Sequence, residues 1–368
     1  MNNCHYIIFH NAFDKIAGTE RVIANLLELL AGIDHVRVTL LLASEPATLA
    51  LDIRAHTDEI VYLSNRIVPG NAFTLIKSHG ALLSKVAGFF RNSDRHPNTV
   101  CLTTSPFLAF IMSIARPAYR PQMRIVSCEH FALSVSGSLS KIVRRLIYSK
   151  IIVVTLTEAD RMQITAEYRP LKCVCIPNAS PFPISAYDTV SKENLILSVG
   201  RLSYQKGFDL LLDAFQEFHQ QFPEWRLLIL GDDYGEKEKL ERMIKSNNLG
   251  PVVTLLPAVS NIETYYRKAS FYVLSSRFEG LPMVMIEAMS FSLPIVAFDC
   301  PTGPADLING DNGILVPDGD VKKLSAALRL LAGDSALLVK QSQEAQQMAS
   351  IFSKKRINKI WLDLFSHI

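Results

Sequence analysis

The sequence predicts an α/β protein with two domains, each a parallel β-sheet with helices on both faces. The first observation is its length, because 368 residues are enough for two domains that each bury their own core. The second is that short apolar runs alternate with helical patterns along nearly the whole chain. The third is a polar stretch with two prolines at 181–193, which separates two such series and is typical of a linker.

The composition is that of a soluble globular protein with an uneven charge. Hydrophobic residues make up 49% of the chain and charged residues 20%, and the net charge is +3. Residues 1–188 hold 19 Lys and Arg against 14 Asp and Glu, which gives +5, whereas residues 189–368 hold 19 against 21, which gives −2. A basic first half suits an anionic partner such as a phospholipid surface or a lipid diphosphate, although chance would also explain the asymmetry.

The cysteines and the apolar runs bear on location. None of the six cysteines forms a C-x-x-C pair or stands near a His at zinc-ligand spacing, so we expect reduced, buried thiols in a cytosolic protein. The start of the chain lacks the pattern of a signal peptide, and the apolar run 106–115 is too short to span a bilayer. We therefore expect a soluble protein or one that rests on a membrane surface.

In the first half, two places at the ends of expected strands stand out. The expected strands are 5–10, 36–42, 59–63, 100–102, 124–128, 151–154 and 174–176. Gly18 precedes a helix and would let the backbone approach a ligand, although a plain strand–helix turn explains it as well. His130 follows the strand 124–128, at the end of a parallel strand where ligands bind in such sheets, or it simply caps a loop.

The segment 139–150 reads as a basic amphipathic helix. It carries Lys141, Arg144, Arg145 and Lys150. Such a helix can lie on anionic lipid or grip the diphosphate of a lipid-linked acceptor. A charged, solvated helix face is the more usual explanation.

In the second half, a glycine-bounded loop suits a diphosphate. The expected strands are 195–199, 226–230, 252–256, 271–274 and 294–298. Between the first of them and a helix from 208 stands Gly200-Arg201-Leu-Ser-Tyr-Gln-Lys206-Gly207. Arg201 can bind phosphate oxygens in bidentate fashion and Lys206 supplies a point charge.

A second motif places two glutamates eight positions apart. Glu279 lies in a loop after the strand 271–274. Glu287 lies in an expected helix over 283–289, which Pro282 would open as a first helical residue because that position needs no amide donor. Backbone N–H groups in the segment Leu281–Val284, from Leu281, Met283 and Val284 around Pro282, would point to the same place. A nucleotide-sugar, with hydroxyls at both ends and anionic oxygens between, fits this arrangement. The alternative is that Glu279 caps the helix and Glu287 is a solvated helix charge.

The triplet Asp318-Gly-Asp320 has two interpretations. As a D-x-D motif it would hold a divalent metal, as it does in one fold of sugar-transferring enzymes. Because it precedes an expected helix over 321–331, we favour Asp320 as the helix N-cap and expect no metal site.

Together these segments resemble the retaining glycosyltransferases of family 4, which have the GT-B fold. The matching segments are AGTERVIANL, LTEAD, IPN, GRLSYQKG, EGLPMVMIEAM and NGILVPDGD. The resemblance covers nearly the whole chain and is strongest from Gly200 to Asp320. The family usually has a glycine where Ser292 stands and a glutamate where Asp306 stands. Both changes are conservative, so they bear on detail rather than on class.

The resemblance implies a fold and a set of roles. It implies two Rossmann-like domains facing across a cleft: 1–180 binds the acceptor, 181–193 is the linker, 194–352 binds the nucleotide-sugar and 353–368 is a helix that crosses back onto the first domain. It assigns the donor diphosphate to Arg201 and Lys206, hydroxyls of the donor sugar to Glu279 and the ribose to Glu287. It also assigns the donor sugar to His130 of the opposite domain, and it places the loop at Gly18 over the cleft.

The function implied is retaining transfer of a sugar from a nucleoside-diphosphate sugar, with UDP favoured, and with no metal or further cofactor. The acceptor would be a glycan or an undecaprenyl-diphosphate-linked glycan in bacterial surface polysaccharide synthesis. We expect a cytoplasmic protein, peripheral on an anionic membrane, with no nucleic acid partner. A nucleotide-sugar epimerase and a non-catalytic sugar-nucleotide-binding subunit are the alternatives. An NAD-dependent oxidoreductase is disfavoured because no G-x-G-x-x-G follows the first strand.

Overall fold

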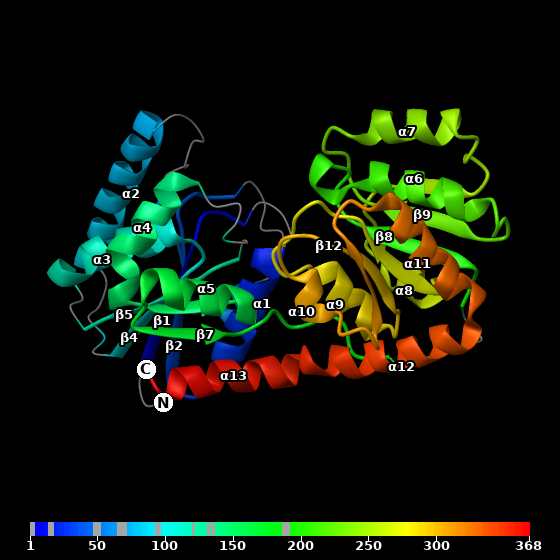
Figure 1. Ribbon diagram of the computed structural model, residues 1–368. Coiled ribbons are helices and arrows are strands. Elements are labelled where there is room, and N and C mark those ends of the chain that lie inside the picture. Colours follow the sequence, from blue (N-terminus) through cyan, green and yellow to red (C-terminus); the bar gives the residue numbers. More distant parts are fainter. Residues whose placement is uncertain are drawn as a thin grey trace. The chain divides into compact units, whose positions relative to one another are not determined.

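The computed structural model describes residues 4–13, 18–46, 53–64, 72–92, 96, 98–119, 122–130, 133, 137–185 and 192–368. The chain forms two compact units, Met1–Pro177 with Ile357–Ile368, and Asn178–Arg356. Part of the expected linker, 186–191, lies outside the described residues. Each unit holds one all-parallel sheet (Figure 1), so the predicted fold class of two Rossmann-like α/β domains is confirmed.

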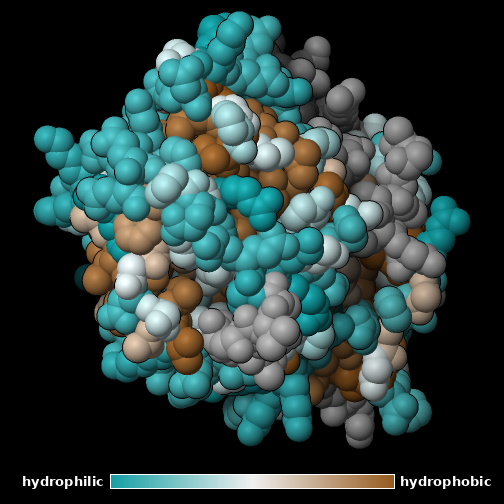
Figure 2. Space-filling view, turned by 90° about the vertical axis from the view of Figure 1, so that its right-hand side faces the viewer, coloured by the Kyte–Doolittle hydropathy of each residue, from teal (hydrophilic) through white to brown (hydrophobic). Residues whose placement is uncertain are grey.

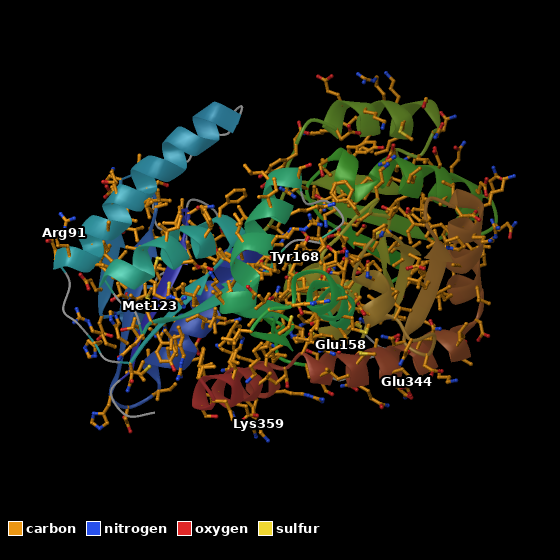
Figure 3. All side chains as sticks on the ribbon, turned by 60° about the vertical axis from the view of Figure 1, so that its left-hand side comes forward. Arg91, Met123, Glu158, Tyr168, Glu344 and Lys359 are labelled. Carbon is orange, nitrogen blue, oxygen red and sulfur yellow. The ribbon has the colours of Figure 1, made fainter. Side chains whose placement is uncertain are left out.

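Unit 1 has a seven-stranded sheet in the order β3-β2-β1-β4-β5-β6-β7. Its strands are β1 (Cys4–His10), β2 (Val36–Leu42), β3 (Glu59–Tyr62), β4 (Asn98–Thr103), β5 (Arg124–Cys128), β6 (Ile152–Thr155) and β7 (Lys172–Cys175). Its helices are α1 (Gly18–Ala31), η1 (Arg54–His56), α2 (Ala72–Asn92), α3 (Pro106–Tyr119), α4 (Ser138–Ile147), η3 (Tyr148–Lys150) and α5 (Glu158–Tyr168), whose ends Figure 3 labels.

The two faces of this sheet are covered by different helices. Ile7 and Phe9 of β1 pack into one apolar cluster with residues of α2, α3, α4 and α5. Because side chains alternate along a strand, Tyr6 lies on the other face. There it contacts Phe365, with ring centroids 4.9 Å apart. Phe365 belongs to α13 (Lys354–Ser366), so the end of the chain packs on unit 1, as the fold prediction expected.

Unit 2 has a six-stranded sheet in the order β10-β9-β8-β11-β12-β13. Its strands are β8 (Leu195–Val199), β9 (Arg226–Leu230), β10 (Val253–Leu256), β11 (Phe271–Leu274), β12 (Ile295–Asp299) and β13 (Gly313–Pro317). Its helices are η4 (Tyr204–Lys206), α6 (Phe208–His219), α7 (Lys237–Ser246), α8 (Glu263–Lys268), α9 (Met283–Ser290), α10 (Pro304–Leu307), α11 (Val321–Gly333) and α12 (Ser335–Ile351).

One apolar cluster joins α6, α7 and α11 to the sheet of unit 2. Helices α8 and α9 contact strands of the same sheet, and α12 packs against α9. The sequence analysis assigned no element to α3, α7 or α12. These helices fill the layers that the alternation of strands and helices requires.

Two expectations about single residues are settled by local contacts. All six cysteines are free; Cys101, Cys128 and Cys300 are buried, and the other three are half-buried. The sequence analysis placed Arg144 on the basic face of an amphipathic helix. This placement is wrong, because α4 turns Arg144 inward and leaves it 3% exposed. None of the helices within the described residues is both long and apolar enough to cross a membrane.

Candidate active site

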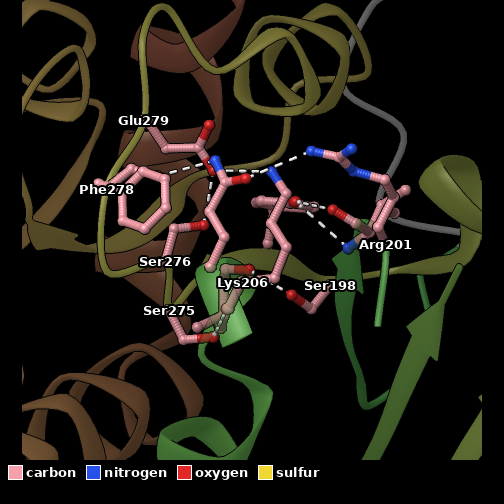
Figure 4. A network of polar contacts seen from close by, with 11 residues as sticks. Ser198, Arg201, Lys206, Ser275, Ser276, Phe278 and Glu279 are labelled. Carbon is pink, nitrogen blue, oxygen red and sulfur yellow. Dashed lines mark hydrogen bonds and ion pairs between the residues drawn. The ribbon is translucent and has the colours of Figure 1, made fainter. Parts of the chain in front are cut away.

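The loops that follow β8 and β11 bring Lys206 and Glu279 into contact (Figure 4). These two strands are parallel neighbours, so their carboxyl ends meet at one edge of the sheet. The Nζ of Lys206 lies 2.7 Å from Oε1 of Glu279, and Oγ of Ser276 donates to the same oxygen at 2.6 Å. Only 12% of the Lys206 side chain and 8% of the Glu279 side chain are exposed. A cation and a carboxylate are therefore held together at the place where a ligand would enter.

Two glycines allow the loops to approach this closely. Gly207 has a φ of 60°, and a Cβ there would lie 2.1 Å from the carbonyl oxygen of Ser275. Gly303 has a φ of 96°, and a Cβ there would lie 1.8 Å from the carbonyl oxygen of Gly280. No side chain fits at either position, so both loops depend on glycine. The backbone of Glu279 is further fixed because its N–H donates to the carbonyl of Pro301 at 2.9 Å.

Arg201 lies at the exposed rim of the same edge. Its guanidinium stacks over the Tyr234 ring at 5.1 Å from the centroid, and its Nη2 donates to Oε1 of Gln205 at 3.3 Å. Both of these partners are neutral, so neither cancels the charge of Arg201. The loop thus presents a cation on the rim and a second one, Lys206, further in.

Helix α9 carries Glu287 into the interior. Glu287 is 4% exposed and accepts a hydrogen bond from the hydroxyl of Tyr266 at 3.0 Å. The hydroxyl of Tyr272 has a pKa raised above its usual value, first by burial and then by the charges of Glu279 and Glu287. Both carboxylates therefore act on one buried hydroxyl.

The alternative interpretation of the two glutamates is wrong on both counts. No side chain caps α9, so Glu279 is not its N-cap, and Glu287 is not solvated. Pro282 was predicted one position too far inward: it is the N-cap, with an extended backbone, and α9 begins at Met283. Met283 and Val284 are half-buried at the start of this helix, next to the buried Leu281.

Unit 1 gathers a polar group at the carboxyl edge of its own sheet. His10 ends β1; its Nδ1 hydrogen-bonds with Oγ1 of Thr104 at 2.8 Å and its Nε2 lies 3.3 Å from Oε1 of Glu20. His130 is half-buried after β5, and Gly18 is the exposed first residue of α1. Burial and the neighbouring His10 lower the pKa of His130 to about 4, against a smaller opposing effect of Glu20. His130 is therefore neutral at pH 7.

The sequence analysis missed His10 and Glu20. The signals were present, because His10 closes an apolar strand run and Glu20 stands in the AGTERV segment. Their pairing depends on how α1 folds back onto β1, which periodicity does not show.

The D-x-D triplet is part of a helix cap. The side chain of Asp320 accepts a hydrogen bond from the N–H of Lys323 at 3.0 Å, so the predicted N-cap is confirmed. Among the described residues, no three His, Cys, Asp or Glu side chains converge in a way that would hold a metal ion.

Comparison with known proteins identifies the family. Residues 180–348 match the model of the family described as glycosyl transferases group 1. The amylovoran biosynthesis glycosyltransferase AmsD of Erwinia amylovora is 32% identical over 77% of this chain and 82% of its own length. This chain belongs to the group 1 glycosyltransferases. Its resemblance to bacterial polysaccharide glycosyltransferases is thereby confirmed.

Two further similarities extend the picture of this glycosyltransferase. A Campylobacter jejuni α-1,4-N-acetyl-D-galactosaminyltransferase, named for a substrate linked to PP-undecaprenol, is 28% identical over 58% of this chain and 59% of its own. The crystal structure of Anabaena HepE in complex with UDP superimposes with a TM-score of 0.80 at 18% identity, over 99% of this chain and all of that one. At this identity the structural match shows the shared fold.

Proposed function

We propose that this glycosyltransferase transfers a sugar from a UDP-sugar to a lipid-linked or glycan acceptor with retention of configuration, in the synthesis of a bacterial surface polysaccharide. The observation that carries the proposal is the pair Lys206–Glu279 at the carboxyl edge of unit 2, with Arg201 on the rim. The name of AmsD, which refers to amylovoran biosynthesis, supports the class of product. The UDP in the HepE structure supports the donor.

Donor binding would exchange partners within this pair. Lys206 is held by Glu279, and a diphosphate brings oxygens that compete for the same ammonium group. Glu279 would then be released to accept hydrogen bonds from hydroxyls of the sugar, while Ser276 keeps it oriented. Arg201 would take the second phosphate from the rim. Glu287, oriented by Tyr266, would accept from the ribose.

The transfer step needs charge stabilisation more than a protein nucleophile. The bond between the anomeric carbon and the phosphate oxygen breaks, and a bond to the acceptor oxygen forms on the same face. The acceptor proton passes to the departing phosphate oxygen. The negative charge that develops on the diphosphate is stabilised by Lys206 and Arg201, which act where a metal ion acts in other transferases. We accordingly propose that the reaction is metal-independent.

The acceptor is proposed from the chemistry of unit 1. Its polar edge carries His10 and Thr104, with the carboxylate of Glu20 beside His10, and these hydrogen-bonding groups suit the hydroxyls of a sugar. The role we propose for the neutral His130 is a hydrogen bond to the donor sugar. The Campylobacter relative, named for a substrate linked to PP-undecaprenol, supports a lipid-linked glycan as acceptor.

The test is nucleotide release from UDP-, GDP- and ADP-sugars with and without an undecaprenyl-diphosphate-linked glycan, in the presence and absence of EDTA. We expect release from one UDP-sugar, dependent on acceptor, indifferent to EDTA and lost in Glu279→Ala. The matched control is Glu59→Ala, which removes another ion-paired carboxylate, half-exposed on β3 and paired with Arg37 at 3.2 Å. NMR of the product then gives the configuration of the new bond.

Three results would contradict the proposal. Acceptor-independent conversion of the UDP-sugar would indicate an epimerase. Release abolished by EDTA would rule out the metal-independent step. An inverted configuration in the product would exclude the retaining mechanism.

A further inference from the structure

The outward face of α4 in unit 1 exposes apolar side chains. Leu139, Ile142 and Leu146 are 40%, 53% and 56% exposed. They stand at positions i, i+3 and i+7, so they form one stripe along the helix. The adjoining side of α4 buries Val143 and Ile147 in the core of the unit. The residues of the stripe do not belong to the apolar core cluster that the described residues of this unit form.

Two exposed cations of α4, Lys141 and Arg145, lie beside the stripe, whereas a third, Arg144, is buried. Arg144 is 3% exposed and donates two hydrogen bonds to Glu129, at 2.8 and 2.9 Å. Lys141 and Arg145 are exposed, and neither forms an ion pair within the described parts of the chain. The nearby acidic group is Glu167 of α5, whose pKa is lowered mainly by Gln163 and Tyr168 and, as smaller effects, by these two cations. Leu139, Lys141, Ile142, Arg145 and Leu146 are called the α4 patch.

Helix α7 of unit 2 shows what a solvated helix of the same length looks like. Its apolar residues Leu240 and Ile244 are buried. Its exposed face carries ion pairs between Lys237 and Glu241 and between Arg242 and Glu238. On the face of the molecule that Figure 2 shows, hydrophilic side chains predominate, with apolar side chains exposed between them. The α4 patch has the opposite character, because it combines apolar side chains with cations of one sign.

Exposed apolar and cationic side chains also lie where α4 ends. The N–H of Leu171 donates to the carbonyls of Tyr148 and Ile151, at 3.2 and 3.1 Å. These bonds place Leu171 beside η3, the turn that follows α4. Leu171 is 69% exposed. It borders a hollow of about 310 Å³ lined by four cationic side chains, Arg116, Arg124, Lys150 and Lys172.

We propose that the α4 patch rests on the surface of an anionic lipid bilayer. The apolar stripe would enter the interface between headgroups and acyl chains, and Lys141 and Arg145 would lie among the phosphates. A second copy of this chain is the less suitable occupant, because a two-fold contact would bring these like charges together. The inference rests on the α4 patch and stands apart from the chemistry proposed for unit 2.

Co-sedimentation with vesicles tests this proposal. We expect the full chain to sediment with vesicles that contain phosphatidylglycerol and to stay in solution with pure phosphatidylcholine vesicles. Reversing both charges in Lys141→Glu/Arg145→Glu should weaken binding at least 25-fold, since each cation near an anionic surface contributes about fivefold. Ile142→Asp/Leu146→Asp should abolish sedimentation.

The controls place the same changes elsewhere on the surface. Leu330→Asp replaces a leucine of α11 that is 52% exposed, and Arg242→Glu/Lys245→Glu reverses two charges on α7. Both controls should sediment like the wild type. Nucleotide release with a water-soluble acceptor should be unchanged in the α4 variants, which separates this proposal from the proposed function.

Three outcomes would overturn the proposal. The wild type would fail to sediment with anionic vesicles, or the α4 variants would sediment as well as the wild type. The third is a dimer, measured by light scattering, that Ile142→Asp/Leu146→Asp converts to a monomer without any effect on vesicle binding. That result would assign the patch to self-association.

Discussion

The carboxyl edges of the two sheets are built by the same rules and differ in charge. The edge of unit 2 carries Arg201, Lys206 and Glu279, with formal charges held on glycine-dependent loops. The edge of unit 1 carries His10, His130, the hydroxyl of Thr104 and one carboxylate, that of Glu20. There burial keeps the pKa of His130 near 4. Parallel strands alone therefore do not decide what an edge binds; the residues in the first turns after the strands do.

This difference suggests a division of labour. Cations in near-buried positions suit the phosphates of a donor, and neutral imidazole and hydroxyl groups suit sugar hydroxyls. Changes at the edge of unit 2 should consequently have the larger effects on turnover.

After the loss of release expected for Glu279→Ala, the largest effect is expected for Lys206→Ala. Turnover should fall about 10³-fold, because one of the two cations that stabilise the departing diphosphate is lost. Lys206→Arg should recover part of it. Steady-state nucleotide release measures both, with Arg226→Ala as a control that removes an exposed cation paired with Glu193. A loss below tenfold would remove Lys206 from the proposed mechanism.

A smaller loss is expected at the edge of unit 1. His130→Ala should lower turnover roughly 30-fold, the equivalent of one hydrogen bond to a sugar of about 2 kcal/mol. His130→Asn, which keeps a donor, should be less affected. UDP affinity measured by calorimetry should stay at the wild-type value in both variants. A weaker UDP complex would mean that His130 acts on the nucleotide, and the contrast between the two edges would fail.

Glu287→Gln should act on donor binding. The amide oxygen can still accept from Tyr266, so the fold is kept, while the weaker acceptor raises the donor KM about tenfold at similar kcat. Tyr266→Phe removes only the orienting hydroxyl and should have a smaller effect in the same direction. An unchanged KM in Glu287→Gln would take the ribose contact away from this residue.

The smallest effect concerns stability against pH. The pKa of His130 is lowered from 6.5 to about 4 in the folded chain, so folding disfavours its protonated form. Above pH 6.5 this imidazole is neutral in both the folded and the unfolded chain. As the pH falls from 6.5 toward 4, the unfolded chain takes up the proton and the folded chain does not, so the free energy of unfolding falls. Between pH 7 and 5 the free energy of unfolding should fall by about 1 kcal/mol through this group, after allowance for its partial exposure. Urea unfolding of wild type and His130→Gln at pH 7 and pH 5 measures this. If the free energy of unfolding falls equally in both proteins between these pH values, the prediction is contradicted.

Much of the fold and part of the site could be predicted from the sequence, because their signals are local. Strand and helix periodicity predicted both sheets except the edge strand β13, and the glycines around Arg201 and Lys206 marked a loop between a strand and a helix. The N-cap role of Asp320 also followed from its position before a helix. Boundaries were less accurate: Pro282 is the N-cap of α9 and not its first residue.

The sequence by itself determined which residues have the chemistry to bind a nucleotide-sugar, since that depends on residue type and spacing. Only the tertiary structure decided their partners. Lys206 meets Glu279, 73 positions away, because the strand order places β8 beside β11. Arg144 turns inward because Glu129 lies at the end of the neighbouring β5, and Leu139 is left exposed on the same helix. Such contacts depend on how distant segments pack against each other, and the periodicity of residues along the chain does not determine that packing.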